Sequence, residues 1–293
     1  MKCRHDPRRD RLSNCSRSLS YLPSRPCGCQ SLLALLEGRS LHTPSVDSPG
    51  WYLSLYPAAG EGGGSFRATL DLTPRPYVAR GSAADPERAA FEAGRRARSK
   101  LRRYCAANGL SRMGTLTYAG GGCHDHLELR DDLREFFRNV RALLGVKAMP
   151  YVWVPEWHKT DHGLHAHFAF GRYVPRWVLD QAWGRGWVHI KYMSNIPQGA
   201  SVLEHSRIAA GYLSKYVAKT FADTTARELG LHRYDVAQGF QPSKVTLYAT
   251  HPDSLIDQAT QLLESPPTQV WRSEGEMDYQ GPPAIWAKWG GAS

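Results

Sequence analysis

The chain has 293 residues with a formal net charge of +10, and its hydrophobic content of 42% is enough for a packed core. This balance favours a polyanionic partner, and nucleic acid rather than a membrane, because no basic helix shows a strong apolar face. No apolar run approaches the length of a membrane span, and the first residues lack the apolar stretch of a signal peptide, so we expect a cytoplasmic protein that does not contact membranes.

Residues 1–64 are rich in Arg, Ser, Pro and Gly and end in the run Gly60-Glu-Gly-Gly-Gly64. This composition predicts a basic, loosely ordered segment. The segment holds four of the six cysteines, at spacings that match no familiar zinc site: Cys3, Cys15, Cys27 and Cys29. In a reducing cytosol we expect these thiols to be reduced, with an N-terminal zinc site as the alternative.

The next stretch alternates strands and helices. Phe66–Leu72 alternates apolar and polar residues, which predicts a strand. A helix then begins with Asp85 as its N-cap and Pro86 at its first position, and it ends at Asn108-Gly109. The excess of arginines on this helix indicates phosphate contacts or a solvated face, and both interpretations stay open.

Met113–Tyr118 is predicted as a short strand, whose threonines Thr115 and Thr117 face the same way. We expect them to support the sheet rather than to take part in chemistry. Asp131–Leu144 has the clearest apolar helical stripe in the chain and is predicted to pack on a sheet, with Gly145 at its C-terminal end.

A β-hairpin is predicted next, with strands at Tyr151–Val154 and Leu164–Phe170 around a loop at Asp161–Gly163. Because alternate residues of a strand share a face, His165 and His167 point the same way.

If a short loop closes near Asp161 and His162, Glu156 lies opposite His165 or His167, on the face of the imidazoles. Two imidazoles and one carboxylate then make a three-ligand site for a divalent cation, with coordination positions left open for substrate. The alternative is a set of half-buried polar residues, but burying two imidazoles side by side is costly without a partner. His158 and His162, in the loop, are alternative third ligands.

After the hairpin, Pro175–Trp183 is predicted as a short helix that stops at Gly184, Trp187–Tyr192 as a strand, and Ile208–Lys219 as a helix. Ser254–Glu264 is the last predicted helix. Short hairpin connections between strands predict an α+β fold, a mostly antiparallel sheet flanked by helices.

The helix at 208–219 carries four polar residues on one stripe: Tyr212, Lys215, Tyr216 and Lys219. Two tyrosines one turn apart, each with a lysine on the same face, form a phosphate-directed surface. The alternative is a solvated amphipathic helix whose tyrosines shelter the lysine stems.

Three blocks, in this order, resemble the HUH endonuclease superfamily, and within it the rolling-circle replication initiators of plasmids and single-stranded DNA phages. Gly114–Tyr118 is similar to the family's first motif, His165-Ala166-His167 to its metal motif, and Tyr212–Lys219 to the two-tyrosine form of its third motif. The resemblance spans roughly residues 110–221. It implies a palm-like, mostly antiparallel central sheet of about five strands, with residues 65–250 as a nicking and joining domain and residues 251–293 as a C-terminal helix and tail.

The resemblance also implies a chemistry, the nicking and rejoining of single-stranded origin DNA through a 5′-phosphotyrosine. It implies Mg²⁺ or Mn²⁺ at His165 and His167, with Glu156 as third ligand. Tyr212 and Tyr216 are candidate nucleophiles that the sequence does not rank, and Lys215 and Lys219 steer phosphate or lower a phenol's pKa. Because the chain has no P-loop motif, we expect a host helicase to unwind the DNA and a host polymerase to copy it.

Three other functions fit parts of this pattern. Two-tyrosine transposases and conjugative relaxases belong to the same superfamily. A non-catalytic module would grip single strands through aromatic residues such as Trp153, Trp157 and Phe168. A metal-dependent hydrolase would use water as nucleophile, and its cleavage would survive the loss of both tyrosine hydroxyls.

Overall fold

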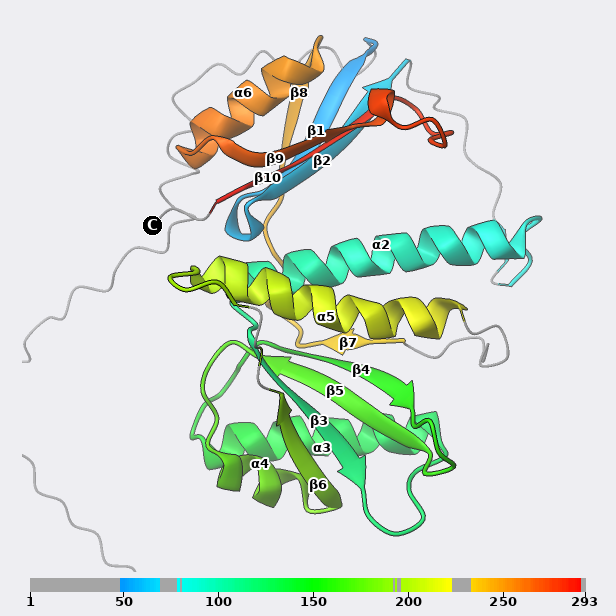
Figure 1. The fold of residues 1–293 in the computed structure, drawn as a ribbon, viewed down its shortest axis with the longest axis vertical. Helices are drawn as coiled ribbons and strands as arrows, with labels where there is room; N and C mark the ends of the chain where they lie inside the picture. Colours follow the sequence, from blue (N-terminus) through cyan, green and yellow to red (C-terminus); the bar gives the residue numbers. More distant parts are fainter. Residues whose placement is uncertain are drawn as a thin grey trace, which may run out of the picture. The chain divides into compact units, whose positions relative to one another are not determined.

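The structure, a computed structural model, describes residues 48–68, 78–79, 81–191, 193, 196–222 and 233–290 (Figure 1). Its strands are β1 (Gly50–Tyr56), β2 (Glu61–Arg67), β3 (Arg112–Tyr118), β4 (Tyr151–Trp157), β5 (Leu164–Phe170), β6 (Gly186–Lys191), β7 (Asp235–Val236), β8 (Val245–Ala249), β9 (Pro267–Arg272) and β10 (Ala284–Trp289). Its helices are α2 (Pro86–Ala107), α3 (His126–Leu143), α4 (Arg176–Trp183), α5 (Val202–Ala222) and α6 (Pro252–Leu263), with 3-10 turns η1 (Pro57–Ala59) and η2 (Ser273–Gly275).

One sheet, which we term the site sheet, contains five antiparallel strands in the order β6-β3-β5-β4-β7. β4 and β5 are the predicted hairpin, and Glu156 lies opposite His165 in its register. The predicted α+β class, with a mostly antiparallel sheet of five strands and helices beside it, is therefore confirmed.

Helices cover both faces of the site sheet (Figure 1). α3 and α4 pack on one face, in a core that includes Phe136, Phe168 and Trp183. α2 and α5 lie side by side over the other face, where Leu101 and Leu213 share a core with Val154 of β4. The predicted site residues are on this second face.

Local sequence signals decide where the helices begin. α3 starts at His126, ahead of the predicted Asp131, because the Asp125 side chain accepts a hydrogen bond from the backbone at 2.7 Å and caps the helix there. At the start of α5, the backbone N–H of Ser201 donates to Glu204 at 2.9 Å and that of Glu204 donates to the Ser201 hydroxyl at 3.2 Å. Because of this reciprocal cap, α5, the tyrosine helix that carries Tyr212 and Tyr216, begins earlier than its apolar pattern alone suggests.

A second antiparallel sheet, in the order β8-β1-β2-β10-β9, has α6 on one face (Figure 1). The prediction of a loosely ordered segment is wrong for residues 50–64, which form β1, η1 and most of β2. Residues 1–47, with Cys3, Cys15, Cys27 and Cys29, lie outside the described residues. Residues 267–289, in the predicted C-terminal tail, supply β9 and β10.

The glycine run at 62–64 is the middle of a strand and not a linker. A Cβ on Gly62 would lie 2.9 Å from a methyl group of Leu53, and a Cβ on Gly64 would overlap the backbone carbonyl of Tyr52. Close packing against β1 therefore accounts for these glycines.

The remaining predictions agree with the structure to within a few residues, including α2 with its cap at Asp85. The predicted strand at Phe66–Leu72 overlaps only the end of β2, and residues 69–77 lie outside the described residues. Cys105 and Cys123 are buried thiols without a disulfide. Within the described part of the chain, no helix is long and apolar enough to cross a membrane.

Candidate active site

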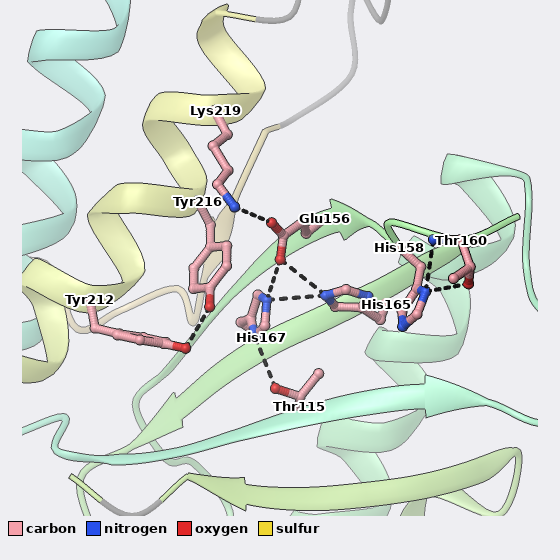
Figure 2. A network of polar contacts seen from close by, with 9 residues as sticks. All are labelled: Thr115, Glu156, His158, Thr160, His165, His167, Tyr212, Tyr216 and Lys219. Carbon is pink, nitrogen blue, oxygen red and sulfur yellow. Dashed lines mark hydrogen bonds and ion pairs between the residues drawn. The ribbon is translucent and has the colours of Figure 1, made fainter. Parts of the chain in front are cut away.

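Three candidate metal ligands come together on the hairpin of β4 and β5 (Figure 2). Glu156 Oε2 lies 3.1 Å from His165 Nε2 and 2.9 Å from His167 Nε2, and the two nitrogens are 3.2 Å apart. The register explains this convergence, since Glu156 pairs directly with His165, and His167 is the next residue on the same face. The predicted convergence of these three side chains is thus observed.

The spacing of these ligand atoms suits a divalent cation. Ligands about 2.1 Å from one ion and at right angles to each other lie about 3.0 Å apart, whereas tetrahedral ligands lie about 3.4 Å apart. The observed separations of 2.9–3.2 Å lie near these values, so all three atoms would be within reach of one ion. Such an ion would have further positions for water or substrate oxygens.

Thr115 of β3 holds the ring of His167 in place. Thr115 pairs directly with His167 in the sheet, and its Oγ1 lies 2.9 Å from Nδ1 of the imidazole. Nε2 offers its lone pair to the cluster only when Nδ1 carries the proton and donates it to Thr115. The Thr115 hydroxyl can accept that proton, so the contact is compatible with the tautomer that a metal ligand requires.

Burial sets the charge state of the cluster. It lowers the pKa of His165 and lowers that of His167 to about 4, so both rings are neutral at pH 7. Burial alone would raise the pKa of Glu156, but hydrogen bonds with Lys219 and His167 outweigh it and the pKa is lowered. Two neutral imidazoles and one carboxylate each offer a lone pair that a divalent cation can accept.

Lys219 of α5 forms an ion pair with the second oxygen of the same carboxylate. Its Nζ is 2.7 Å from Glu156 Oε1, which leaves Oε2 directed at the imidazoles. The same Nζ lies 5.3 Å from the ring centroid of Tyr216. The sequence suggested that Lys219 acts on phosphate or phenol, and the structure adds this contact with the carboxylate.

α5 directs its two tyrosines at the cluster (Figure 2). The ring of Tyr216 stacks on His167 with centroids 3.8 Å apart and planes inclined by 25°. The Tyr216 hydroxyl donates a hydrogen bond to the Tyr212 oxygen at 2.6 Å. Burial and this hydrogen bond raise the pKa of Tyr216. The imidazoles and the tyrosine helix therefore lie on the same side of the site sheet, as their predicted cooperation requires.

Two lysines flank Tyr212. The Nζ atoms of Lys191, at the end of β6, and Lys215, on α5, lie 5.2 and 5.9 Å from its ring centroid. Lys215 was predicted from helical spacing, whereas Lys191 was not. Their charges make this side of α5 attractive to phosphate.

Comparison with known families bears on the segment that builds this site. Residues 111–221 match a family model described as replication-associated protein ORF2. Over this segment the chain is similar to replication-associated proteins. The segment runs from β3 through α5 and is less than half of the 293-residue chain. Searches among curated proteins and among solved structures found no match.

The match supports a replication initiator of the Rep type and is consistent with DNA as a partner. It includes every residue of the cluster and both tyrosines. It does not include the second sheet, α2 or α6.

Two alternative ligands in the matched segment have other partners. His158 Nδ1 is 2.6 Å from Thr160 Oγ1 and accepts the Thr160 backbone N–H at 3.2 Å. His162 Nε2 is 2.8 Å from the carbonyl oxygen of Tyr118, which ties the hairpin loop to β3. Among the described residues, neither belongs to the cluster that includes Glu156.

Sequence reasoning missed the side of β6 that faces the site. Trp187 and His189 pair directly with Thr117 and Thr115, so they share the face of the two imidazoles. Trp187 is 61% exposed, and an exposed indole beside a polar cluster indicates a contact surface. The strand itself was predicted, but which of its side chains point toward the site depends on its pairing with β3, which is a long-range contact.

Proposed function

We propose that the protein starts rolling-circle replication by nicking and rejoining single-stranded DNA, with a tyrosine as nucleophile and Mg²⁺ or Mn²⁺ at Glu156, His165 and His167. The observation that carries this proposal is the stacking of Tyr216 on His167 at 3.8 Å, which brings the tyrosine helix against the candidate ligands. The family match over residues 111–221 supports the replication role.

The residues of the site have separate parts in this reaction. When bound, the cation would neutralise charge on the scissile phosphate and orient it for in-line displacement. Thr115 positions His167, and Lys219 positions Glu156. Lys191 and Lys215 attract the DNA backbone toward Tyr212.

Tyr212 is the better placed first nucleophile. Its oxygen accepts the hydrogen bond from Tyr216, and Lys191 and Lys215, which attract phosphate, lie near its ring. Tyr216 donates that bond and its pKa is raised, so it keeps its proton. We assign Tyr216 to the later step, in which the strand is rejoined.

The first step exchanges one phosphoester for another. The tyrosine oxygen loses its proton and bonds to phosphorus, the bond from phosphorus to the 3′ oxygen breaks, and that oxygen takes up a proton. The products are a 5′-phosphotyrosine and a free 3′-OH, from which a host polymerase extends. Because the phosphodiester energy is kept in the adduct, the second tyrosine can end the round without an external energy source.

The test uses single-stranded oligonucleotides tiled across the DNA that flanks the gene, each labelled at its 3′ end, because the 3′ fragment stays on the protein. With Mn²⁺ or Mg²⁺, we expect a protease-sensitive labelled adduct on a denaturing gel, and none with a chelator. Tyr212→Phe should lose the adduct, Tyr216→Phe should keep it, and the double variant should form none. Cleavage without any adduct would mean that water attacks, and the tyrosine mechanism would then be rejected.

A further inference from the structure

The second sheet has an outer face, opposite α6, that the proposed site does not use. Tyr52 on β1 pairs directly with Tyr248 on β8, and Trp286 on β10 pairs directly with Trp271 on β9. We propose that this outer face is a second binding surface for single-stranded DNA, on which bases stack against these four rings. The inference does not depend on the nicking chemistry.

Part of the outer face is open, whereas the opposite face is a core. Around Glu61, the outer face is covered by α2. Leu53 and Ile285, directed at α6, are 0% and 2% exposed. Tyr248 is 42% exposed, and the other three rings of the outer face are half-buried. The solvent side of an antiparallel sheet ordinarily carries polar side chains, so four aromatic rings there indicate a surface used for contacts.

Small residues of β2 separate the two aromatic pairs. Ser65 pairs with Tyr52, and Gly63 pairs with Trp286. A Cβ on Gly63 would meet Trp286, at 3.4 Å, and the Ile285 carbonyl, at 3.8 Å; apart from the chain neighbours of Gly63, no other described atom lies within 4 Å of that position. Two strand spacings of about 4.8 Å and an offset of two residues along the strands place the pairs about 12 Å apart, and a flat base can reach the rings from this gap.

Arginines surround these rings. Three of them lie over aromatic side chains of the outer face: Arg67 over Tyr52 at 4.9 Å, Arg102 over Trp286 at 5.5 Å and Arg103 over Tyr56 at 4.4 Å. Arg102 and Arg103, which belong to α2, also pair with Glu61 at 2.8 and 3.7 Å. Since Glu61 is 2% exposed, these two arginines anchor α2 to the outer face.

α2 extends the positive charge beyond the sheet. Residues seven apart lie on the same side of a helix, so Arg95 and Arg96 share a side with Arg102 and Arg103. The side chains of Arg95 and Arg96 are 60% and 67% exposed, and the two share a single carboxylate, Glu92. The positive charge of Arg95 and Arg96 that Glu92 does not neutralise suits phosphates, which favours phosphate contact over a merely solvated face for this helix.

The combination of open rings and arginines favours a single strand over other partners. Bases in a duplex are stacked on one another, whereas those of a single strand are free to stack on side chains. The arginines select a polyanion, which argues against an apolar protein surface as the occupant.

The test is fluorescence anisotropy with the full chain, a chelator, and a labelled oligo-dT of about 20 nucleotides, longer than most single-strand sites. Tyr248→Ala and Trp271→Ala should each weaken binding by about fivefold or more, since a stacked base contributes about 1–3 kcal/mol. Tyr248→Phe and Trp271→Phe keep a ring and should bind within about twofold of wild type. Trp177→Ala, which removes a tryptophan of 59% exposure on α4, is the matched control and should have no effect.

A charge variant tests the phosphate contacts. Arg95→Ala combined with Arg96→Ala should reduce the slope of log affinity against log salt by about one to two. Unchanged affinity in the two alanine variants, or equal affinity for an oligo-dT·oligo-dA duplex of the same length, would overturn the proposal. So would a loss in the phenylalanine variants as large as in the alanine variants.

The experiment separates this surface from the nicking site. At saturating DNA, Tyr248→Ala and Trp271→Ala should still form the covalent adduct. If Tyr212→Phe and Tyr216→Phe together abolish the adduct but leave oligo-dT binding intact, the two functions are independent. If no adduct forms in any variant, the nicking proposal fails while the binding result still decides the second surface.

Discussion

Replacing Thr115 by Val removes one hydrogen-bonding atom and nearly preserves side-chain volume. His167 Nδ1 then loses its partner at 2.9 Å, inside a side chain that is only 8% exposed. An unpaired buried N–H costs about 1–3 kcal/mol, and moving the proton to Nε2 would remove the lone pair that a cation needs. Loss of such a support typically lowers metal affinity by 10- to 100-fold, so we expect Mn²⁺ binding to weaken by about 1.4–2.7 kcal/mol.

The assay is calorimetric titration of the full chain with Mn²⁺ at pH 7.5, with Thr117→Val as the matched control. Thr117 lies on the same strand and face but is paired with His165 and Trp187 rather than with His167. The control should bind Mn²⁺ within about twofold of wild type. Wild-type affinity in Thr115→Val, or an equal loss in both variants, would refute the idea that this hydroxyl sets the tautomer of a metal ligand.

Three further predictions concern the same site. Folding lowers the pKa of His167 from 6.5 to about 4 and also lowers the pKa of Glu156, so the free energy of unfolding should be highest above pH 6.5 and should fall as the pH drops toward 4. Urea unfolding at pH 7.5 and 4.5 will measure the difference. Lys219→Met should change the free energy of unfolding by less than about 1 kcal/mol, since Lys219 is 61% exposed. The variant should slow adduct formation, because Glu156 is no longer held, whereas Lys219→Arg should retain most of the rate. Trp187→Ala should weaken single-strand binding by about fivefold or more in anisotropy and leave Mn²⁺ affinity unchanged.

Each of these predictions can fail separately. Equal stability at the two pH values would contradict neutral, buried imidazoles in the folded protein. A wild-type rate in Lys219→Met would mean that the ion pair does not position the carboxylate. Unchanged DNA binding in Trp187→Ala would remove β6 from the DNA path.

The sequence predicts features that rest on local geometry. The convergence of Glu156, His165 and His167 follows from strand alternation and a short loop, both of which can be counted along the chain. The tyrosine stripe of α5 likewise follows from helical spacing alone. Contacts between distant residues are different: the ion pair of Lys219 with Glu156 joins positions 63 residues apart, and no local pattern indicates it.

The second sheet escaped prediction partly for the same reason. The pairing of β2 with β10 joins segments more than two hundred residues apart, which no local pattern indicates, although β1 and β2 themselves form a local hairpin. The glycines of β2 added to the error, since their composition is that of a linker. Gly62 and Gly64 are needed because Leu53 and Tyr52 approach them closely, and only the folded arrangement reveals this approach.

The site lies where one face of the site sheet changes from covered to open. Val154 pairs with His167 and shares a core with Leu213 of α5, so the helix is held by apolar contacts directly beside a ligand. On the other side of the imidazoles, β6 presents the exposed Trp187. The covered side lowers the local dielectric and strengthens the electrostatic interactions of the cluster. In the proposed reaction, the tyrosines of α5 would act beside this covered side, and the DNA strand would enter from the open side at β6.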